Sequence, residues 1–71
     1  MTNTPGQRIK QLRKENKMSI AELAKGTEVS EKYIRDLEND LIEPNLTVMA
    51  KIALVFGVSV NKLMMGINDP E

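Results

Sequence analysis

Residues typical of helix N-caps recur along this chain at intervals of eleven to fifteen positions, and each is followed by the start of an apolar pattern. Thr4 precedes a proline and stands three residues before Gln7. Ser19 stands three residues before Glu22, which is the spacing of a capping box. Later caps are expected at Ser30, Asn45 and Ser59. Starts this closely spaced allow only short helices.

Glycines mark the expected ends of three of these helices: Gly26, Gly57 and Gly66. Between starts and ends, apolar residues recur every three or four positions, and no segment alternates with the period of two that strands show. The sequence therefore predicts an all-α fold, a compact domain of five helices. Their expected bounds, good to a few residues, are about 5–16, 19–26, 30–39, 45–56 and 59–65.

The length of 71 residues suits one small domain, expected over 1–71 with a core at about 6–66. The start MTNTPGQ does not read as a signal peptide, and the near-apolar stretch 48–60 is too short to cross a bilayer. We expect a cytoplasmic protein without a membrane partner. The chain has no cysteine, no histidine and no glycine-rich phosphate loop. We therefore expect no metal, no cofactor, no small-molecule substrate and no enzymatic activity.

The second and third expected helices are separated by only three residues, Thr27-Glu28-Val29, which lie between Gly26 and the cap at Ser30. Two helices joined by so short a turn cross steeply, and Ala24 permits close contact between them. This is the geometry of a helix-turn-helix, whose second helix enters the major groove of DNA.

The chain resembles the phage-repressor/Cro-like helix-turn-helix family from about Gly6 to Gly66. The resemblance lies in the order and spacing of E-L-A, V-S-x-x-Y-I, L-E-N, P-N-L and K-I-A…G-V-S within the stretches MSIAELAKGTEVSEKYIRDLEN and EPNLTVMAKIALVFGVSVNKLM. It implies a lambda-repressor-like DNA-binding fold in a bacterial or phage-type transcriptional regulator, a repressor. Such a protein binds double-stranded DNA as a homodimer on a roughly palindromic operator and is associated with the nucleoid when bound.

The resemblance also implies roles for individual residues. Arg13 and Glu38 match an ion pair that ties the first helix to the end of the third. Base contacts are implied for one face of the third helix, at Glu31, Lys32, Tyr33 and Asp36. Contacts with the DNA backbone are expected from Ser19, Ser30, Arg35, Asn39, Lys14 and Lys17.

Several of these residues also have a purely local interpretation. Arg35 can pair with Glu31 four positions earlier, and the ring of Tyr33 can pack against the second helix. The basic residues of the first helix and its exit either follow a phosphate strand or are only solvated; they are Arg8, Lys10, Lys14 and Lys17.

The sequence departs from the family pattern at several positions. Ile20 stands where a glutamine commonly contacts DNA and has no hydrogen-bonding group. Glu28 stands where glycine is usual, so a positive φ there would cost about 1 kcal/mol. Asp40 replaces a glycine after the third helix, a position that aspartate tolerates fairly well. Lysine or arginine is common at Leu41, Ile42 and Leu54.

The charge distribution leaves a second function open. Residues 1–18 carry a net charge of +4 and residues 19–43 a net charge of −4, although the chain is neutral overall. Phosphate-binding surfaces are usually basic. The alternative is a protein-interaction module that keeps the fold and binds a protein partner. A dimer or partner interface would be formed by Leu41, Ile42, Leu54, Met64, Met65 and Ile67, unless these side chains pack against their own chain.

Overall fold

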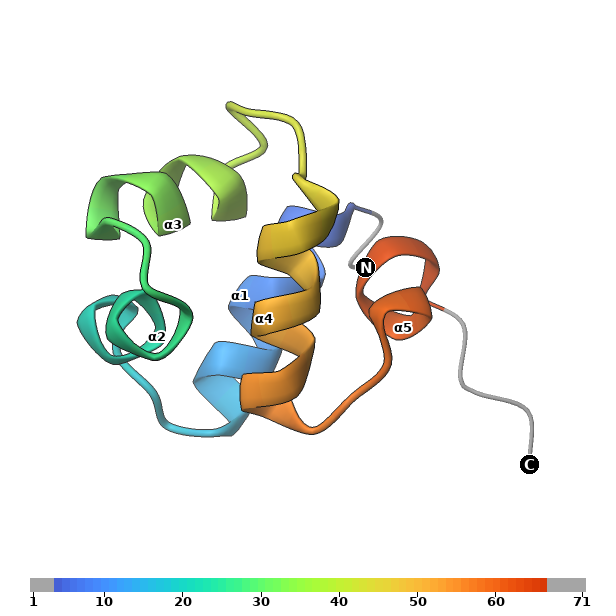
Figure 1. The fold of residues 1–71 in the computed structure, drawn as a ribbon, viewed down its shortest axis with the longest axis horizontal. Helices are drawn as coiled ribbons and strands as arrows, with labels where there is room; N and C mark the ends of the chain where they lie inside the picture. The colour runs from blue at the N-terminus through green and yellow to red at the C-terminus, as the bar shows by residue number, and fades with distance from the viewer. Residues whose placement is uncertain (1–3, 67–71) are drawn as a thin grey trace.

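The computed structural model describes residues 4–66, which form five α-helices and no strand (Figure 1). The helices are α1 (Pro5–Glu15), α2 (Ile20–Thr27), α3 (Glu31–Glu38), α4 (Leu46–Phe56) and α5 (Val60–Met65). Each observed bound lies within one residue of the expected one. The predicted all-α class is confirmed.

The expected N-caps are present at all five helices. The Ser19 hydroxyl accepts from the Glu22 backbone N–H at 3.0 Å, and Glu22 Oε1 accepts from the Ser19 N–H at 2.9 Å. This reciprocal pair is the capping box that the sequence predicts. Oxygens of the other caps accept from N–H groups of the first turn in the same way; these caps are Thr4, Ser30, Asn45 and Ser59.

The end of α2 differs from the prediction. Gly26 lies inside the helix, and the C-cap is Glu28, which has a left-handed φ of 60°. The hydroxyl of the fully buried Thr27 donates to the Leu23 carbonyl at 2.8 Å, so its polar group is satisfied inside the helix. The helix therefore ends one residue later than expected, and the left-handed C-cap is Glu28 rather than Gly26.

The core receives buried side chains from every helix. Its members are Ile9, Leu23, Ala24, Ile34, Leu37, Met49, Ile52, Ala53 and Leu63. In Figure 1, α4 stands at the centre, with α2 and α3 on one side and α5 on the other. Burial of each large apolar side chain stabilises the fold by about 1.5–3 kcal/mol. None of the helices in this part of the chain is long and apolar enough to span a bilayer.

Arg8 connects the two ends of the described chain. Its Nε donates to the Leu63 carbonyl at 2.7 Å, and its Nη2 donates to the Met64 carbonyl. Carbonyls in the last turn of a helix have no partner within that helix, so the guanidinium satisfies two of them and fastens α5 to α1. The sequence did not suggest this role for Arg8, which was expected only to follow a phosphate strand or to be solvated.

Candidate nucleic-acid interface

The turn between α2 and α3 is held by its own backbone. The Val29 N–H donates to the Ala24 carbonyl at 3.1 Å, and the Glu28 N–H donates to the Lys25 carbonyl at 3.3 Å. Ala24 is only 4% exposed where the two helices pack together. Figure 1 shows α2 nearly end-on and α3 lengthwise, so the two helices cross steeply as expected for a helix-turn-helix.

The third helix has one buried side and one polar side. Ile34 and Leu37 are fully or almost fully buried, together with Glu38. Glu31, Lys32 and Arg35 are exposed, and Tyr33 and Asp36 are half-buried. The buried side fixes the orientation of the helix, so the polar side is presented to solvent by a rigid element.

Two ion pairs lie on this polar side. Lys32 Nζ is 2.7 Å from Asp36 Oδ2, whereas Arg35 Nη1 is 3.9 Å from Glu31 Oε1. The second contact is the local pairing considered for Arg35. Its groups are about half exposed, and such a pair contributes only a few tenths of a kcal/mol. The Lys32–Asp36 pair was not anticipated, although its spacing of four residues is visible in the sequence.

Three of the four residues expected to contact bases gather around one shallow hollow. The hollow has a volume of about 380 Å³ and is lined by Lys32, Tyr33 and Asp36. Glu31 does not line it. The other lining residues are Ser30, Ile42, Glu43 and Asn45. Tyr33 also packs partly against the core. Tyr33 therefore contributes to the packing of the fold and also lines the hollow.

The residues expected to contact the DNA backbone are all exposed, but they are not all near α3. Ser19 and Ser30 cap α2 and α3, and Asn39 is the C-cap of α3. Lys14 and Lys17 lie at the end of α1 and in the connection that follows. In Figure 1 that connection runs below α2, whereas α3 lies above it.

Glu22 adds a negative charge beside the Ser19 cap. The Ser19 backbone N–H, which donates to the Glu22 carboxylate, holds the pKa of that carboxyl below its ordinary value, and the Ser19 side chain acts in the same direction. A carboxylate in the first turn also faces the positive end of the helix dipole. At neutral pH the positive end of the α2 dipole is therefore already compensated by the Glu22 carboxylate.

Arg13 and Glu38 form an ion pair between α1 and the end of α3. Arg13 Nε is 2.7 Å from Glu38 Oε2, and the two side chains are 12% and 3% exposed. The pair therefore lies almost entirely within the protein, where it connects the helix-turn-helix to the first helix. Within residues 4–66, no three acidic, histidine or cysteine side chains are grouped so that they could hold a metal ion.

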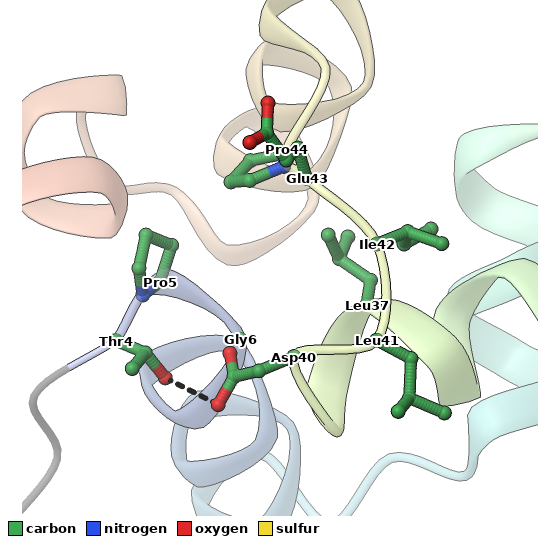
Figure 2. Close-up of a pocket in the computed structure, with 9 residues that line it drawn as sticks. All are labelled: Thr4, Pro5, Gly6, Leu37, Asp40, Leu41, Ile42, Glu43 and Pro44. Atoms are coloured by element: carbon green, nitrogen blue, oxygen red, sulfur yellow. Dashed lines mark hydrogen bonds between the residues drawn. The ribbon is translucent and has the colours of Figure 1, made fainter.

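The connection between α3 and α4 separates the first hollow from a second one, shown in Figure 2. The second hollow, of about 290 Å³, lies against the start of α1. Thr4 Oγ1 donates to Asp40 Oδ2 at 3.0 Å across it, and Asp40 has a φ of 61°. The Thr4 cap and the left-handed Asp40 therefore hold this connection in place beside α1.

The apolar residues considered for an interface do not form one surface. Leu41, Leu54 and Met65 are 71%, 82% and 66% exposed, so these three side chains do not pack against the core of their own chain. Ile42 and Met64 pack partly against the core, as does Ile20. Ile67 lies outside the described residues. In Figure 1 the α3–α4 connection and the C-terminal end of α4 lie at opposite edges of the molecule.

Comparison with known protein families gives a match to the helix-turn-helix model over residues 9–63. The chain is similar to the immunity repressor protein of Bacillus phage phi105, with 36% identity over 61 residues that cover 86% of this chain and 42% of the relative. It is also similar to the transcriptional regulator SinR of Bacillus licheniformis, with 40% identity over 67 residues, 93% of this chain and 60% of SinR. The chain thus spans about half the length of these relatives.

Two solved structures have a similar fold. The crystal structure of the master regulator for biofilm formation SinR in complex with DNA gives a TM-score of 0.80 and 39% identity, covering 84% of this chain and 97% of that one. The SinR/SinI protein complex gives a TM-score of 0.78 and 41% identity, covering 82% of this chain and 57% of that one. These matches confirm the helix-turn-helix fold that the sequence predicts.

Proposed function

The chain belongs to the helix-turn-helix family. On this basis we propose that it is a transcriptional regulator, a repressor, that binds double-stranded DNA in a sequence-specific way. In this proposal α3 enters the major groove, and α2 lies across the DNA backbone. The family is one of transcription regulators, so the chain is not an enzyme, as expected.

The observation that carries this proposal is the polar side of α3. Lys32, Tyr33 and Asp36 share one hollow on a helix whose opposite side is locked into the core. Hydrogen-bonding side chains on a rigid helix are what base recognition in the major groove requires. The SinR structure in complex with DNA, at 39% identity, supports DNA binding.

The acidic residues of α3 are compatible with this role because each has a basic partner. Asp36 is paired with Lys32 at 2.7 Å, and Glu31 lies 3.9 Å from Arg35. A paired carboxylate repels phosphate less than an isolated one does. The net charge of −4 over residues 19–43 therefore overstates the repulsion that α3 itself would exert.

The DNA backbone would be contacted from two sides of the motif. One group of expected contacts lies at the ends of α2 and α3 or on the exposed side of α3: Ser19, Ser30, Asn39 and Arg35. The other group, Lys14 and Lys17, lies at the end of α1 and in the connection that leads to α2. A single module of this size buries little DNA surface. We therefore propose a homodimer that places two copies of α3 about 34 Å apart on a roughly palindromic operator.

The first test measures binding to random-sequence duplex DNA by fluorescence anisotropy at several salt concentrations. We expect the logarithm of the affinity to fall linearly with the logarithm of salt concentration, since bound lysines and arginines release counterions from phosphate. Operator selection from a randomised duplex pool follows. Absence of binding at low salt, together with a pool that yields no enriched sequence, would contradict DNA binding.

A protein-interaction module is the second candidate, and the exposed Leu41 favours it. The SinR/SinI complex is an example of a related chain with a protein partner. However, Ile20 and Ile42 are half-buried and pack against the core, so they do not extend Leu41 into an apolar patch. The DNA-binding measurement separates the two functions, because a module that binds only a protein would show no salt-dependent DNA affinity.

A further inference from the structure

We propose that Lys32 and Asp36 act together as a reader of one G·C base pair, with Lys32 donating to guanine and Asp36 accepting from the cytosine amino group. This inference rests on the proposed function, because it requires α3 to lie in the major groove. It adds a sequence preference to that function.

The two side chains form a donor and an acceptor held side by side. Lys32 Nζ is 2.7 Å from Asp36 Oδ2, one helical turn apart on α3. The Lys32 side chain is 78% exposed and that of Asp36 is 23% exposed. The lysine is therefore the more accessible of the two groups, and most of the Asp36 side chain is covered by neighbouring residues.

The spacing of this pair matches the edge of a G·C pair. In the major groove guanine presents the acceptors N7 and O6, and cytosine presents the N4 amino donor. O6 and N4 are joined by the hydrogen bond of the base pair itself, so they lie about 2.9 Å apart. An ammonium and a carboxylate oxygen at 2.7 Å can therefore contact both bases at once.

An A·T pair also offers one acceptor beside one donor, but the neighbouring groups are unfavourable. The acceptor is thymine O4, which is flanked by the C5 methyl group rather than by a second acceptor. The donor is adenine N6, which is flanked by N7, and the lone pair of N7 repels a carboxylate. A G·C pair gives Lys32 two acceptors, and the outer neighbour of the cytosine N4 amino group is a C5–H group rather than an acceptor.

The other ion pair of α3 does not have this match. Arg35 Nη1 and Glu31 Oε1 are 3.9 Å apart, and both side chains are about half exposed. That separation exceeds the spacing of O6 and N4 by about 1 Å. For this reason we assign the base-pair contact to Lys32 and Asp36 alone.

The test exchanges the two charges in the double substitution Lys32→Asp and Asp36→Lys. The exchange keeps the net charge and an i,i+4 pair, with the acidic residue now first, which is the favoured order in a helix. Sequences are then selected from a randomised duplex pool with the wild-type and exchanged proteins. We expect the wild type to select G·C at one position of each half-site, and the exchanged protein to prefer C·G there by about tenfold.

A matched control exchanges a pair outside α3. Lys51 Nζ lies 3.8 Å from Glu28 Oε1, between α4 and the end of α2. The double substitution Glu28→Lys and Lys51→Glu also keeps the net charge. It is expected to leave the selected sequence unchanged.

The inference is overturned if the exchanged protein selects the same base pair as the wild type. It is also overturned if that protein binds no sequence while its helix content and melting temperature remain those of the wild type.

If the exchanged protein does not fold, the same selection is carried out with the Asp36→Asn variant. Its amide also donates, so we expect a loss of about tenfold in the preference for cytosine, and an unchanged preference would exclude the contact. Failure of the wild type to bind any DNA would instead contradict the proposed function itself.

Discussion

Arg13 and Glu38 are joined by two hydrogen bonds between α1 and the end of α3. Arg13 Nε donates to Glu38 Oε2 at 2.7 Å, and Nη2 donates to Oε1 at 3.1 Å. The third guanidinium nitrogen, Nη1, donates to the Met18 carbonyl at 2.9 Å. One arginine therefore connects α1, the residue before the α2 cap and the end of α3 at a nearly buried point.

We expect Glu38→Ala to lower the free energy of unfolding by about 3 kcal/mol, because it leaves the guanidinium charge unpaired in a site with little access to water. Arg13→Lys keeps the charge but loses the planar fork, and a smaller loss above about 1 kcal/mol is expected. Urea denaturation followed by circular dichroism measures both. A loss below 1 kcal/mol for Glu38→Ala would show that the pair behaves as a solvated surface contact.

Gly6 lies at a close contact between α1 and α3. A Cβ at this position would lie 2.1 Å from the Leu37 carbonyl oxygen and 2.6 Å from Asp40 Oδ1. We expect Gly6→Ala to destabilise the fold by about 1–3 kcal/mol, because the backbone of one helix must move. Gly26→Ala is the control, since its Cβ would meet only Val55 Cγ2, at 3.4 Å. There alanine should stabilise α2 by about 1 kcal/mol, and equal effects of the two substitutions would contradict the argument.

Glu28 has a left-handed backbone that glycine adopts without cost. Its φ is 60°, and its contact with Lys51 is exposed and 3.8 Å long. We expect Glu28→Gly to raise the melting temperature and to stabilise the fold by about 0.5 kcal/mol, since relief of strain outweighs a weak ion pair. Lys25→Gly, inside the same helix, should lower stability by about 1 kcal/mol. If both the Glu28→Gly and the Lys25→Gly variants were less stable than the wild type, the backbone at Glu28 would not be strained.

Glu22 gives the stability of α2 a dependence on pH. Its pKa is lowered below the ordinary value of 4.5, so its carboxylate form is favoured in the folded protein. The resulting stabilisation is present above pH 4.5 and is lost as the pH falls through the lowered folded pKa. At pH 7 we expect the wild type to have a higher melting temperature than the Glu22→Gln variant. This difference in melting temperature is expected to become smaller as the pH falls below 4.5. A difference that does not change with pH would show that the charge contributes nothing.

Lys14 and Lys17 can be tested as phosphate contacts. Each change to alanine should lower the slope of log affinity against log salt by about one unit, uniformly across DNA sequences. Lys62→Ala is the control, because α5 lies across α4 from α3 (Figure 1). Anisotropy titrations at four or more salt concentrations measure the slopes. Slopes unchanged in both lysine variants would mean that these residues are only solvated.

Local chemistry made the helices predictable from the sequence. A capping residue such as Ser19 acts on N–H groups two or three positions later, so its effect requires only neighbouring residues. The same holds for the positive φ values at Gly57 and Gly66. In α2 the helix ended one residue beyond Gly26, and the left-handed C-cap fell on Glu28 instead.

The candidate site was predictable only in part. The spacing of Lys32 and Asp36 is a property of any helix and can be read from the sequence. Their position beside Tyr33 in one hollow depends on how α3 packs against the core and on the path of the connection to α4, which supplies other lining residues.

The sequence by itself determined where helices begin, which side of each is apolar and which family the chain resembles, because these follow from contacts within one or two turns. The tertiary structure alone decided that Arg8 binds the carbonyls of α5, that Gly6 meets the Leu37 carbonyl, and that Leu41 remains exposed while Ile42 is half-buried. Each of these outcomes joins segments distant in sequence or depends on the path of a loop. They are set by how the helices pack into one core, which no local pattern specifies.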